Sequence, residues 1–152
     1  MAFKMKLDFV DVVCNDSLKN TYVNGKRLGY EFQIRLSNYR GHYLSCIQEL
    51  AVKVDGKEVH ADDLSLCLNE KEFTLQQIPS LISEFWNVIE PATIKVYAPG
   101  GLSEGEHTID VTLLVRIPYM PVPGSNKEHD YAVLDSCGTK TLQIVEGVQV
   151  NG

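Results

Sequence analysis

The sequence TIKVYAPGGLSEGEHTIDVTLLVRIPY, from Thr93 to Tyr119, decides the fold. Its second half places apolar side chains at every second position, namely Ile109, Val111, Leu113, Val115 and Ile117. The alternate positions are polar, with the exception of Leu114. Because successive side chains of a strand point to opposite faces of a sheet, this period of two predicts a long, half-buried antiparallel strand over 106–119. The proline and glycines at 99–105 predict a chain reversal after a shorter strand at 93–97.

The same alternation recurs on the N-terminal side of this stretch. Gly29–Ser37 places Tyr30, Phe32, Ile34 and Leu36 on one face. Further strands are expected at 7–13, 44–54, 57–59, 64–68, 73–75 and 139–145. Tight turns are expected at 24–25 and 55–56, and a helical turn or two at 77–83. Polar connections are expected at 15–26 and 124–135, and the prolines at 118, 121 and 123 are expected to break strand pairing.

These elements amount to roughly eight to ten short strands with turn signals about every ten residues and little helix. That spacing predicts an all-β fold, an antiparallel β-sandwich or barrel. At 152 residues, with no repeat and no linker, the chain is expected to form a single domain over 1–152. The pattern is weakest in the tail after about residue 121.

Composition excludes several classes of partner. The net charge of -6 argues against nucleic acid, which needs a basic surface, and no basic run suits anionic lipid. No apolar run approaches the ~20 residues of a membrane-spanning helix. The first residues lack the pattern of a secretory signal, and the four cysteines form no C-x-x-C pair. A cytoplasmic protein with reduced thiols is therefore expected.

The sequence contains no recognisable catalytic motif. It has no G-x-S-x-G, no H-E-x-x-H and no phosphate loop, so no catalytic residue is assigned. The histidines are widely spaced, and even His42 and His60 lie 18 positions apart, which argues against a cupin-like metal site. No metal ligand and no cofactor are assigned to this chain. His107 has the inward parity of the long strand and is expected to be a satisfied buried histidine, whereas His60 is expected in a solvated loop.

One segment is a candidate contact surface for a partner or a substrate. Tyr39, Arg40, His42 and Tyr43 lie within five residues, and aromatic side chains beside arginine are enriched at interfaces. The alternative is a loop whose tyrosines cover the open end of the core. The pair Phe85 and Trp86 is either a plug for one end of the barrel or an exposed hydrophobic anchor.

Two further candidates lie just before the long strand and within it. Gly100, Gly101 and Leu102 form either a tight connection between strands or a second contact surface. Arg116 lies on the polar face of the long strand. It is expected to pair with Asp110 or Glu31, or else to contact a partner subunit.

Several of these blocks together carry a family resemblance. They are GYEFQIRLSNYRGHYLS at 29–45, VDGKEV at 54–59, KEFTL at 71–75, GGLSEGEH at 100–107 and RIPY at 116–119. In this order and spacing the chain resembles the small (beta) subunit of bacterial C-glycoside deglycosidases. The likeness runs from about Asn15 to Tyr119 and is weaker after Pro121.

The resemblance implies a heteromeric complex in which this chain is a non-catalytic, accessory subunit of a carbon–carbon lyase. The partner would be an alpha subunit with a sugar-isomerase-like β/α barrel that holds a divalent metal ion, manganese. The implied substrate is a 3-oxo-C-glycoside of a flavonoid or related phenol. Its C3 ketone acidifies the C2 proton, a base removes that proton, and the aglycone carbon leaves C1 as it is protonated. The beta subunit would shape the mouth of the alpha site through residues 39–43 and the 99–105 turn.

Two other functions fit the residues alone. One is a stand-alone carbohydrate-binding β-sandwich, in which exposed aromatic side chains stack on sugar rings. The other is a purely structural assembly protein.

Overall fold

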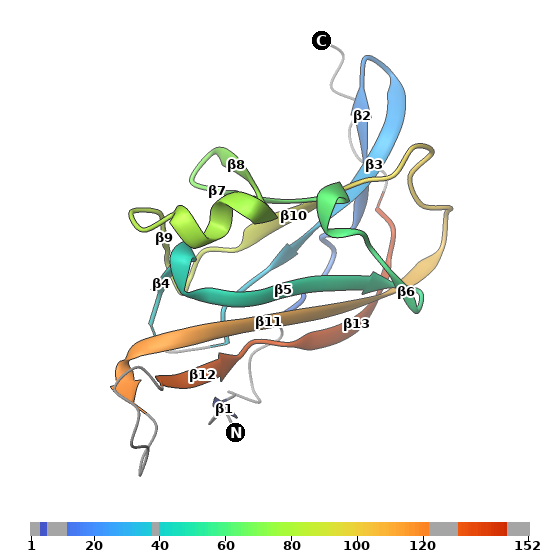
Figure 1. Ribbon diagram of the computed structural model, residues 1–152. Coiled ribbons are helices and arrows are strands. Elements are labelled where there is room, and N and C mark those ends of the chain that lie inside the picture. Colours follow the sequence, from blue (N-terminus) through green and yellow to red (C-terminus); the bar gives the residue numbers. More distant parts are fainter. Residues whose placement is uncertain (1–3, 6–11, 38–39, 122–130, 146–152) are drawn as a thin grey trace.

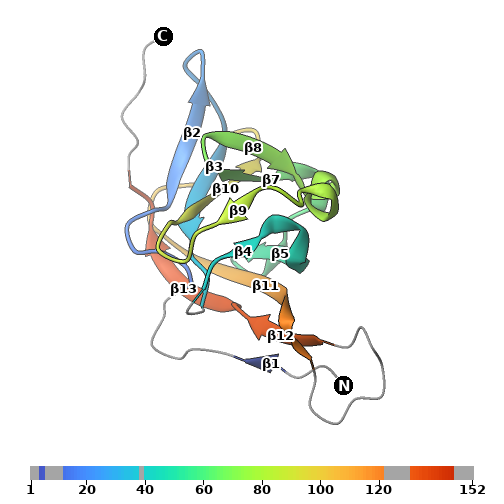
Figure 2. The ribbon, with the colours of Figure 1, turned by 90° about the vertical axis from the view of Figure 1, so that its left-hand side faces the viewer.

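The computed structural model describes residues 4–5, 12–37, 40–121 and 131–145, and it confirms an all-β fold with little helix (Figure 1). Thirteen strands lie in this part of the chain, more than the eight to ten expected. Two open sheets face each other, so the fold is a sandwich and not a barrel (Figure 2).

The strands form three sheets. Sheet A has the order β1-β12-β11-β5-β6, with β13 also paired to β11. Sheet B has the order β2-β3-β10-β7-β8, and sheet C is the pair β4-β9. The bounds in sheet A are β1 (Lys4–Met5), β5 (Ile47–Val54), β6 (Lys57–Glu58), β11 (Glu106–Pro121), β12 (Tyr131–Asp135) and β13 (Gly138–Gln143). Those in sheets B and C are β2 (Lys19–Val23), β3 (Lys26–Ile34), β7 (Leu64–Leu68), β8 (Lys71–Thr74), β10 (Ala92–Tyr97), β4 (His42–Tyr43) and β9 (Phe85–Trp86).

The core lies between sheets A and B and contains the side chains that the alternation predicts. Ile109, Val111, Leu113 and Val115 of β11 are buried, as expected from their shared parity. The opposing face comes from sheet B, with Tyr30, Phe32 and Ile34 of β3, Ile94 and Val96 of β10, and Leu64, Leu66 and Leu68 of β7. Burial of these rows stabilises the sandwich by roughly 1.5–3 kcal/mol for each large aliphatic or aromatic side chain.

The predicted turns set the register of the hairpins. Val23 pairs with Lys26 and Val54 with Lys57, so each hairpin has a two-residue loop. The loop residues Asn24, Gly25, Asp55 and Gly56 all have positive φ, as a type I′ turn requires. The second hairpin matters for the site, because its turn places Asp55 beside the start of β11.

Four sequence expectations need correction. The supposed connection 15–26 contains β2, and the supposed loop 124–135 ends in β12. β2 is an edge strand without a buried face, so apolar alternation does not mark it.

Residues 44–46 form a 3-10 turn, η1 (Leu44–Cys46), before β5 begins. β11 continues through Pro118, and its pairing with β12 shifts register between Arg116 and Pro121. That irregularity accommodates residues without an N–H donor.

Other expectations are confirmed or lie outside the described residues. The helical turns near 77–83 appear as η3 (Leu75–Ser80), and a further 3-10 turn, η2 (Ala61–Asp63), precedes β7. The strand expected at 7–13 falls mostly outside the described residues, although Val13 bridges to Ile34. No helix in the described residues is long and apolar enough to cross a membrane.

Candidate functional site

Sheet C closes one end of the sandwich and contains three of the sequence-predicted site residues, His42, Tyr43 and Trp86. His42 pairs with Trp86 across the strands, and both side chains are buried; Trp86 is only 1% exposed. The indole Nε1 donates to the Glu90 carbonyl oxygen at 2.7 Å. Burial lowers the pKa of His42, so the imidazole is neutral at physiological pH. Of the two alternatives for Phe85 and Trp86, the buried plug applies to Trp86, whereas Phe85 is 43% exposed.

Tyr43 and Phe85 form the outward-facing pair of sheet C. Their rings meet edge to face, with centroids 5.0 Å apart and an interplanar angle of 77°. Gly41 makes this arrangement possible, because a Cβ there would lie 2.3 Å from the Trp86 carbonyl oxygen and 2.6 Å from the Phe85 ring.

Two further exposed apolar side chains lie close to this pair in the sequence. Ile82 and Ile89 flank β9 in sequence, and Ile89 is 83% exposed. We call Tyr43, Ile82, Phe85 and Ile89 the β4–β9 patch. The Leu44 N–H donates to the Glu84 carbonyl, and Lys71 pairs with the Glu84 carboxylate at 2.7 Å. These two contacts fix the backbone at residue 84, which directly precedes β9. An apolar patch with a charged rim is typical of a protein interface.

Two other predicted residues adjoin the β4–β9 patch in sequence. Arg40 is exposed and takes part in an interaction. Tyr39 lies outside the described residues.

The glycine turn, residues 98–105, lies between β10 and β11 and contains the remaining candidates. The Gly100 N–H donates to the Arg27 carbonyl, and Asn20 holds Leu102 through both of its amide atoms, at 2.8 Å to the N–H and 3.0 Å to the carbonyl. Gly101 has φ +61°, and a Cβ there would meet Asn20 Oδ1 at 2.4 Å. Hydrogen bonds therefore hold this turn against the β2–β3 hairpin.

His107 joins the glycine turn to the β5–β6 turn. Its Nδ1 lies 2.6 Å from Asp55 Oδ2, and its Nε2 lies 2.7 Å from the Ser103 carbonyl oxygen. Asp55 Oδ1 also accepts from the Thr108 N–H at 2.9 Å. We call the Asp55–His107–Ser103 contacts the latch. His107 is buried and satisfied, as the sequence predicted, whereas His60 is 73% exposed, as expected of a solvated loop residue.

The latch geometry defines the charge state of His107. A carbonyl oxygen only accepts, so Nε2 donates to Ser103, and an ionised Asp55 accepts from Nδ1. Burial alone would lower the pKa of His107, but the hydrogen bonds to Asp55 and Ser103 and the Asp55 charge together raise it. The hydrogen bonds from His107 and the Thr108 N–H, with charge attraction to His107, lower the pKa of Asp55. Both shifts favour an imidazolium of His107 paired with a carboxylate of Asp55.

The two groups of predicted contact residues do not meet. In Figure 1, β4 and β9 lie at the left of the sandwich and the glycine turn lies at the right. Turning the molecule brings β4 and β9 to the front, with the β2–β3 hairpin behind them (Figure 2). Residues 40–43 and the 99–105 turn therefore form two separate surfaces of this chain. Whether either one shapes the mouth of the alpha site stays a prediction.

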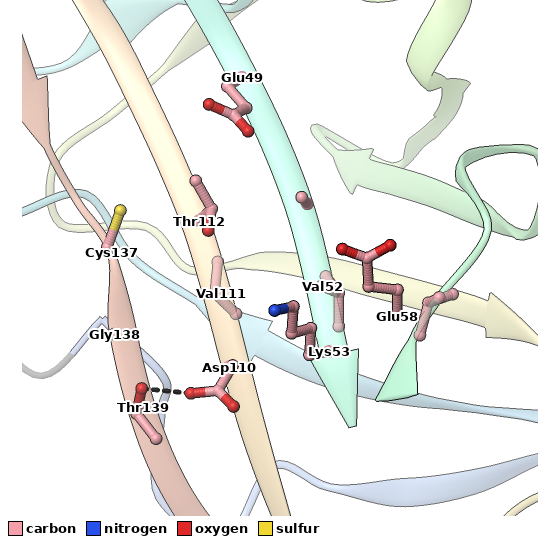
Figure 3. Close-up of a pocket in the computed structure, with 12 residues that line it drawn as sticks. Glu49, Val52, Lys53, Glu58, Asp110, Val111, Thr112, Cys137, Gly138 and Thr139 are labelled. Carbon is pink, nitrogen blue, oxygen red and sulfur yellow. Dashed lines mark hydrogen bonds between the residues drawn. The ribbon is translucent and has the colours of Figure 1, made fainter. Parts of the chain in front are cut away.

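A third surface crosses the outer face of sheet A. It is an open groove of about 720 Å³ across β5, β11 and β13. Figure 3 shows Glu49, Lys53, Asp110 and Thr139 along it, with the Thr139 hydroxyl donating to the Asp110 carboxylate. It is open to solvent along its length, so it offers a surface rather than an enclosed reaction site.

Arg116, also on β11, does not pair as predicted. Its Nε is buried and has no hydrogen-bond partner, and neither Asp110 nor Glu31 contacts it. The Asp110 carboxylate instead accepts from Thr139. A partner-subunit contact stays a prediction for this side chain.

Sequence reasoning did not identify Tyr30, Asp55, Ile82 and Ile89 as site residues. Asp55 could have been recognised only from strand register, because the pairing of Val54 with Ile109 brings the β5–β6 turn to the start of β11. Among the described residues, no three histidine, cysteine, aspartate or glutamate side chains lie close enough to share a metal ion. The metal that the resemblance implies belongs to the partner alpha subunit, and it stays a prediction.

Comparison with known proteins gives a consistent result. The family model described as "C-glycoside deglycosidase beta subunit" matches residues 9–119. The "C-glycoside deglycosidase beta subunit" of Eubacterium cellulosolvens is 34% identical over 98 residues, which cover 64% of this chain and 67% of that protein.

Two relatives from Microbacterium extend this result. The "3'-dehydrocarminate deglycosidase beta subunit" of a Microbacterium species is 39% identical over 97 residues, covering 63% of this chain and 72% of that protein. A "C-glycoside deglycosidase beta subunit" of Microbacterium trichothecenolyticum is 30% identical over 116 residues, covering 74% and 82%.

Proposed function

Because the chain belongs to the C-glycoside deglycosidase beta subunit family, we propose that it is the accessory subunit of a complex that cleaves the carbon–carbon bond of 3-oxo-C-glycosides. The observation that carries this proposal is the family match over 9–119, which includes β4, β9 and the glycine turn. The relative named for 3'-dehydrocarminate supports an oxidised sugar as substrate. Flavonoid or other phenolic aglycones are the proposed leaving groups.

The proposed reaction is an elimination. The C3 ketone acidifies the C2 proton, which a base removes. The electron pair of the C2–H bond forms a C1–C2 double bond, and the electrons of the C1–aglycone bond go to the aglycone carbon, which takes up a proton. The products are the free aglycone and an unsaturated keto-sugar, so the complex acts as a lyase.

We propose that the alpha subunit, a sugar-isomerase-like β/α barrel, supplies the base and the divalent metal ion, manganese. The chemistry of the described residues supports this division. His42 is buried within sheet C, and both nitrogens of His107 are engaged in the latch, so neither imidazole is placed to act as the base. We propose the cytoplasm as the compartment, which the four unbridged cysteines support.

The β4–β9 patch is the proposed contact surface for the alpha subunit. Tyr43 and Phe85 are aromatic side chains of the kind that dominate interface energetics, and Ile82 and Ile89 extend the apolar area around them. Arg40 and the Lys71–Glu84 ion pair provide a polar rim. Truncation of an interface anchor typically costs more than about 1 kcal/mol, which is at least a fivefold loss of affinity.

Co-expression with a candidate large subunit tests the function. Release of aglycone from a 3-oxo-C-glucoside is measured with and without this chain, and we expect full activity only from the co-purified pair. A large subunit that is fully active alone and does not bind this chain would refute the proposal.

Variants of the patch test its role as the contact surface. Tyr43→Ala and Phe85→Ala should weaken co-purification and activity together. Val23→Ala is the matched control, because it removes an exposed apolar side chain from the tip of the β2–β3 hairpin. Equal binding by all three variants would contradict the β4–β9 patch as the interface.

A further inference from the structure

A cavity of about 650 Å³ opens at the glycine-turn end of the sandwich. Its walls come from β3, the β5–β6 turn, the end of β10 and residues 101–103 of the glycine turn. This volume lies within the roughly 300–1,000 Å³ typical of small-molecule sites. The latch forms one side of the cavity, because Asp55, Ser103 and His107 all line it.

Tyr30 brings to this cavity a hydroxyl that no other protein group uses. Its side chain is only 4% exposed and lines the cavity. Within the described part of the chain its hydroxyl has no hydrogen-bond partner. Burial, helped by the Asp55 charge, raises the pKa of Tyr30 to about 12, so the hydroxyl keeps its proton. The ring is buried, whereas the hydroxyl reaches the cavity and is not taken up by another protein group, so it is positioned to exchange hydrogen bonds with a molecule there.

The other lining groups restrict what that molecule is. Val54, Val96 and Leu102 provide an apolar wall against which the faces of a ring pack. The carboxylates of Asp55, Glu58 and Asp63 also line the cavity, against the single ammonium of Lys57. Because His107 is already paired with Asp55, the excess of negative charge disfavours an anion. Asp55 is 46% exposed and keeps lone pairs to accept from a hydroxyl.

We propose that this cavity binds a neutral, hydroxyl-bearing ring, with the Tyr30 hydroxyl and the Asp55 carboxylate as its hydrogen-bonding partners. Sugars and phenols share this chemistry, and the experiment below distinguishes them. The cavity is formed by this chain alone, so the proposal does not depend on the proposed function.

The test is an NMR titration of the full-length, ¹⁵N-labelled chain with D-glucose, with phenol and with D-glucuronate. We expect saturable shifts of the amide signals of residues 101–103 and 55–56 with glucose, phenol or both, and weaker binding of the charged glucuronate than of glucose. Shifts with one probe identify a sugar or a phenol as the ligand type. Glucose and phenol that both leave these signals unmoved would overturn the proposal, as would glucuronate that binds as well as glucose.

Tyr30→Phe provides the matched variant, because it removes only the hydroxyl. We expect it to weaken binding about fivefold, as for one neutral hydrogen bond, and to unfold at the temperature of the natural chain or above. Thr112→Val removes a hydroxyl from the outer groove of sheet A and should leave binding unchanged. Natural affinity in Tyr30→Phe, or an equal loss in Thr112→Val, would contradict the assignment of the site.

Discussion

Asp55→Asn tests whether the latch holds His107 as a cation. In the natural chain the Asp55 carboxylate accepts from His107 at 2.6 Å and from the Thr108 N–H at 2.9 Å. Asparagine keeps an oxygen for Thr108 but loses the charge that pairs with the buried imidazolium. A hydrogen bond to a charged group contributes about 1.5–3 kcal/mol, and the exposure of Asp55 favours the lower end. We expect the free energy of unfolding to fall by about 1.5 kcal/mol near pH 6, or about 3–6 °C in Tm for a chain of this size.

The pH dependence of this loss follows from the two pKa shifts. The pKa of His107 is raised above its ordinary 6.5, so its contribution is complete below about pH 6.5 and is lost as the pH rises through the folded-state value. The pKa of Asp55 is lowered below its ordinary 3.8, so its contribution is present above about pH 4 and is lost as the pH falls through the folded-state value. The stability difference between the natural chain and the variant should therefore be largest between about pH 4 and 6.5.

Urea unfolding at pH 3, 5.5 and 9 measures this difference. Asp62→Asn is the matched control, because Asp62 lies 3.6 Å from His60 in a pair whose side chains are 69% and 73% exposed. That variant should change stability by less than about 0.5 kcal/mol at every pH. A loss for Asp55→Asn that equals the control, or that does not vary with pH, would refute the ion pair in the latch.

Three single substitutions test other contacts. Asn20→Ala removes both hydrogen bonds to Leu102, so we expect a loss of about 1–2 kcal/mol and faster hydrogen exchange at the Leu102 amide; unchanged exchange would contradict the pinned turn. Gly41→Ala places a Cβ against the Trp86 carbonyl, so we expect a Tm lower by several degrees, and a Tm equal to the natural one would argue against the close approach. Arg116→Met removes a buried unpartnered Nε, so urea unfolding of the isolated chain should show equal or higher stability, by up to about 1 kcal/mol. A clear loss would mean that Arg116 has a stabilising contact.

The sequence predicts the sandwich wherever one face of a strand is buried, and it fails where neither face is. β11 and β3 alternate over their buried stretches, so their inward residues are identified correctly. β2 is an edge strand with half-exposed side chains, and a polar segment of this kind is indistinguishable from a loop until its partner is known.

The candidate site shows the same limit. The inward parity of His107 predicts its burial, but the identity of its partner does not follow from the sequence. Asp55 lies 52 residues away, and only the pairing of β5 with β11 brings the two together. The role of the Tyr30 hydroxyl is even harder to predict. Core parity predicts that the ring is buried, but it does not predict a polar atom without a protein partner at the end of the sandwich.

The two ends of the sandwich should respond to mutation independently. Tyr43 precedes β5 by one 3-10 turn and Asp55 follows it, so the eight-residue strand holds the β4–β9 patch and the latch about 26 Å apart. Effects at sites more than about 7–10 Å apart without shared partners add to within about 0.5 kcal/mol. Combining Phe85→Ala with Asp55→Asn should therefore give the sum of the two separate losses in unfolding free energy. A coupling above about 1 kcal/mol by urea unfolding would mean that the strands transmit strain between the ends, and docking at the patch would then alter the cavity.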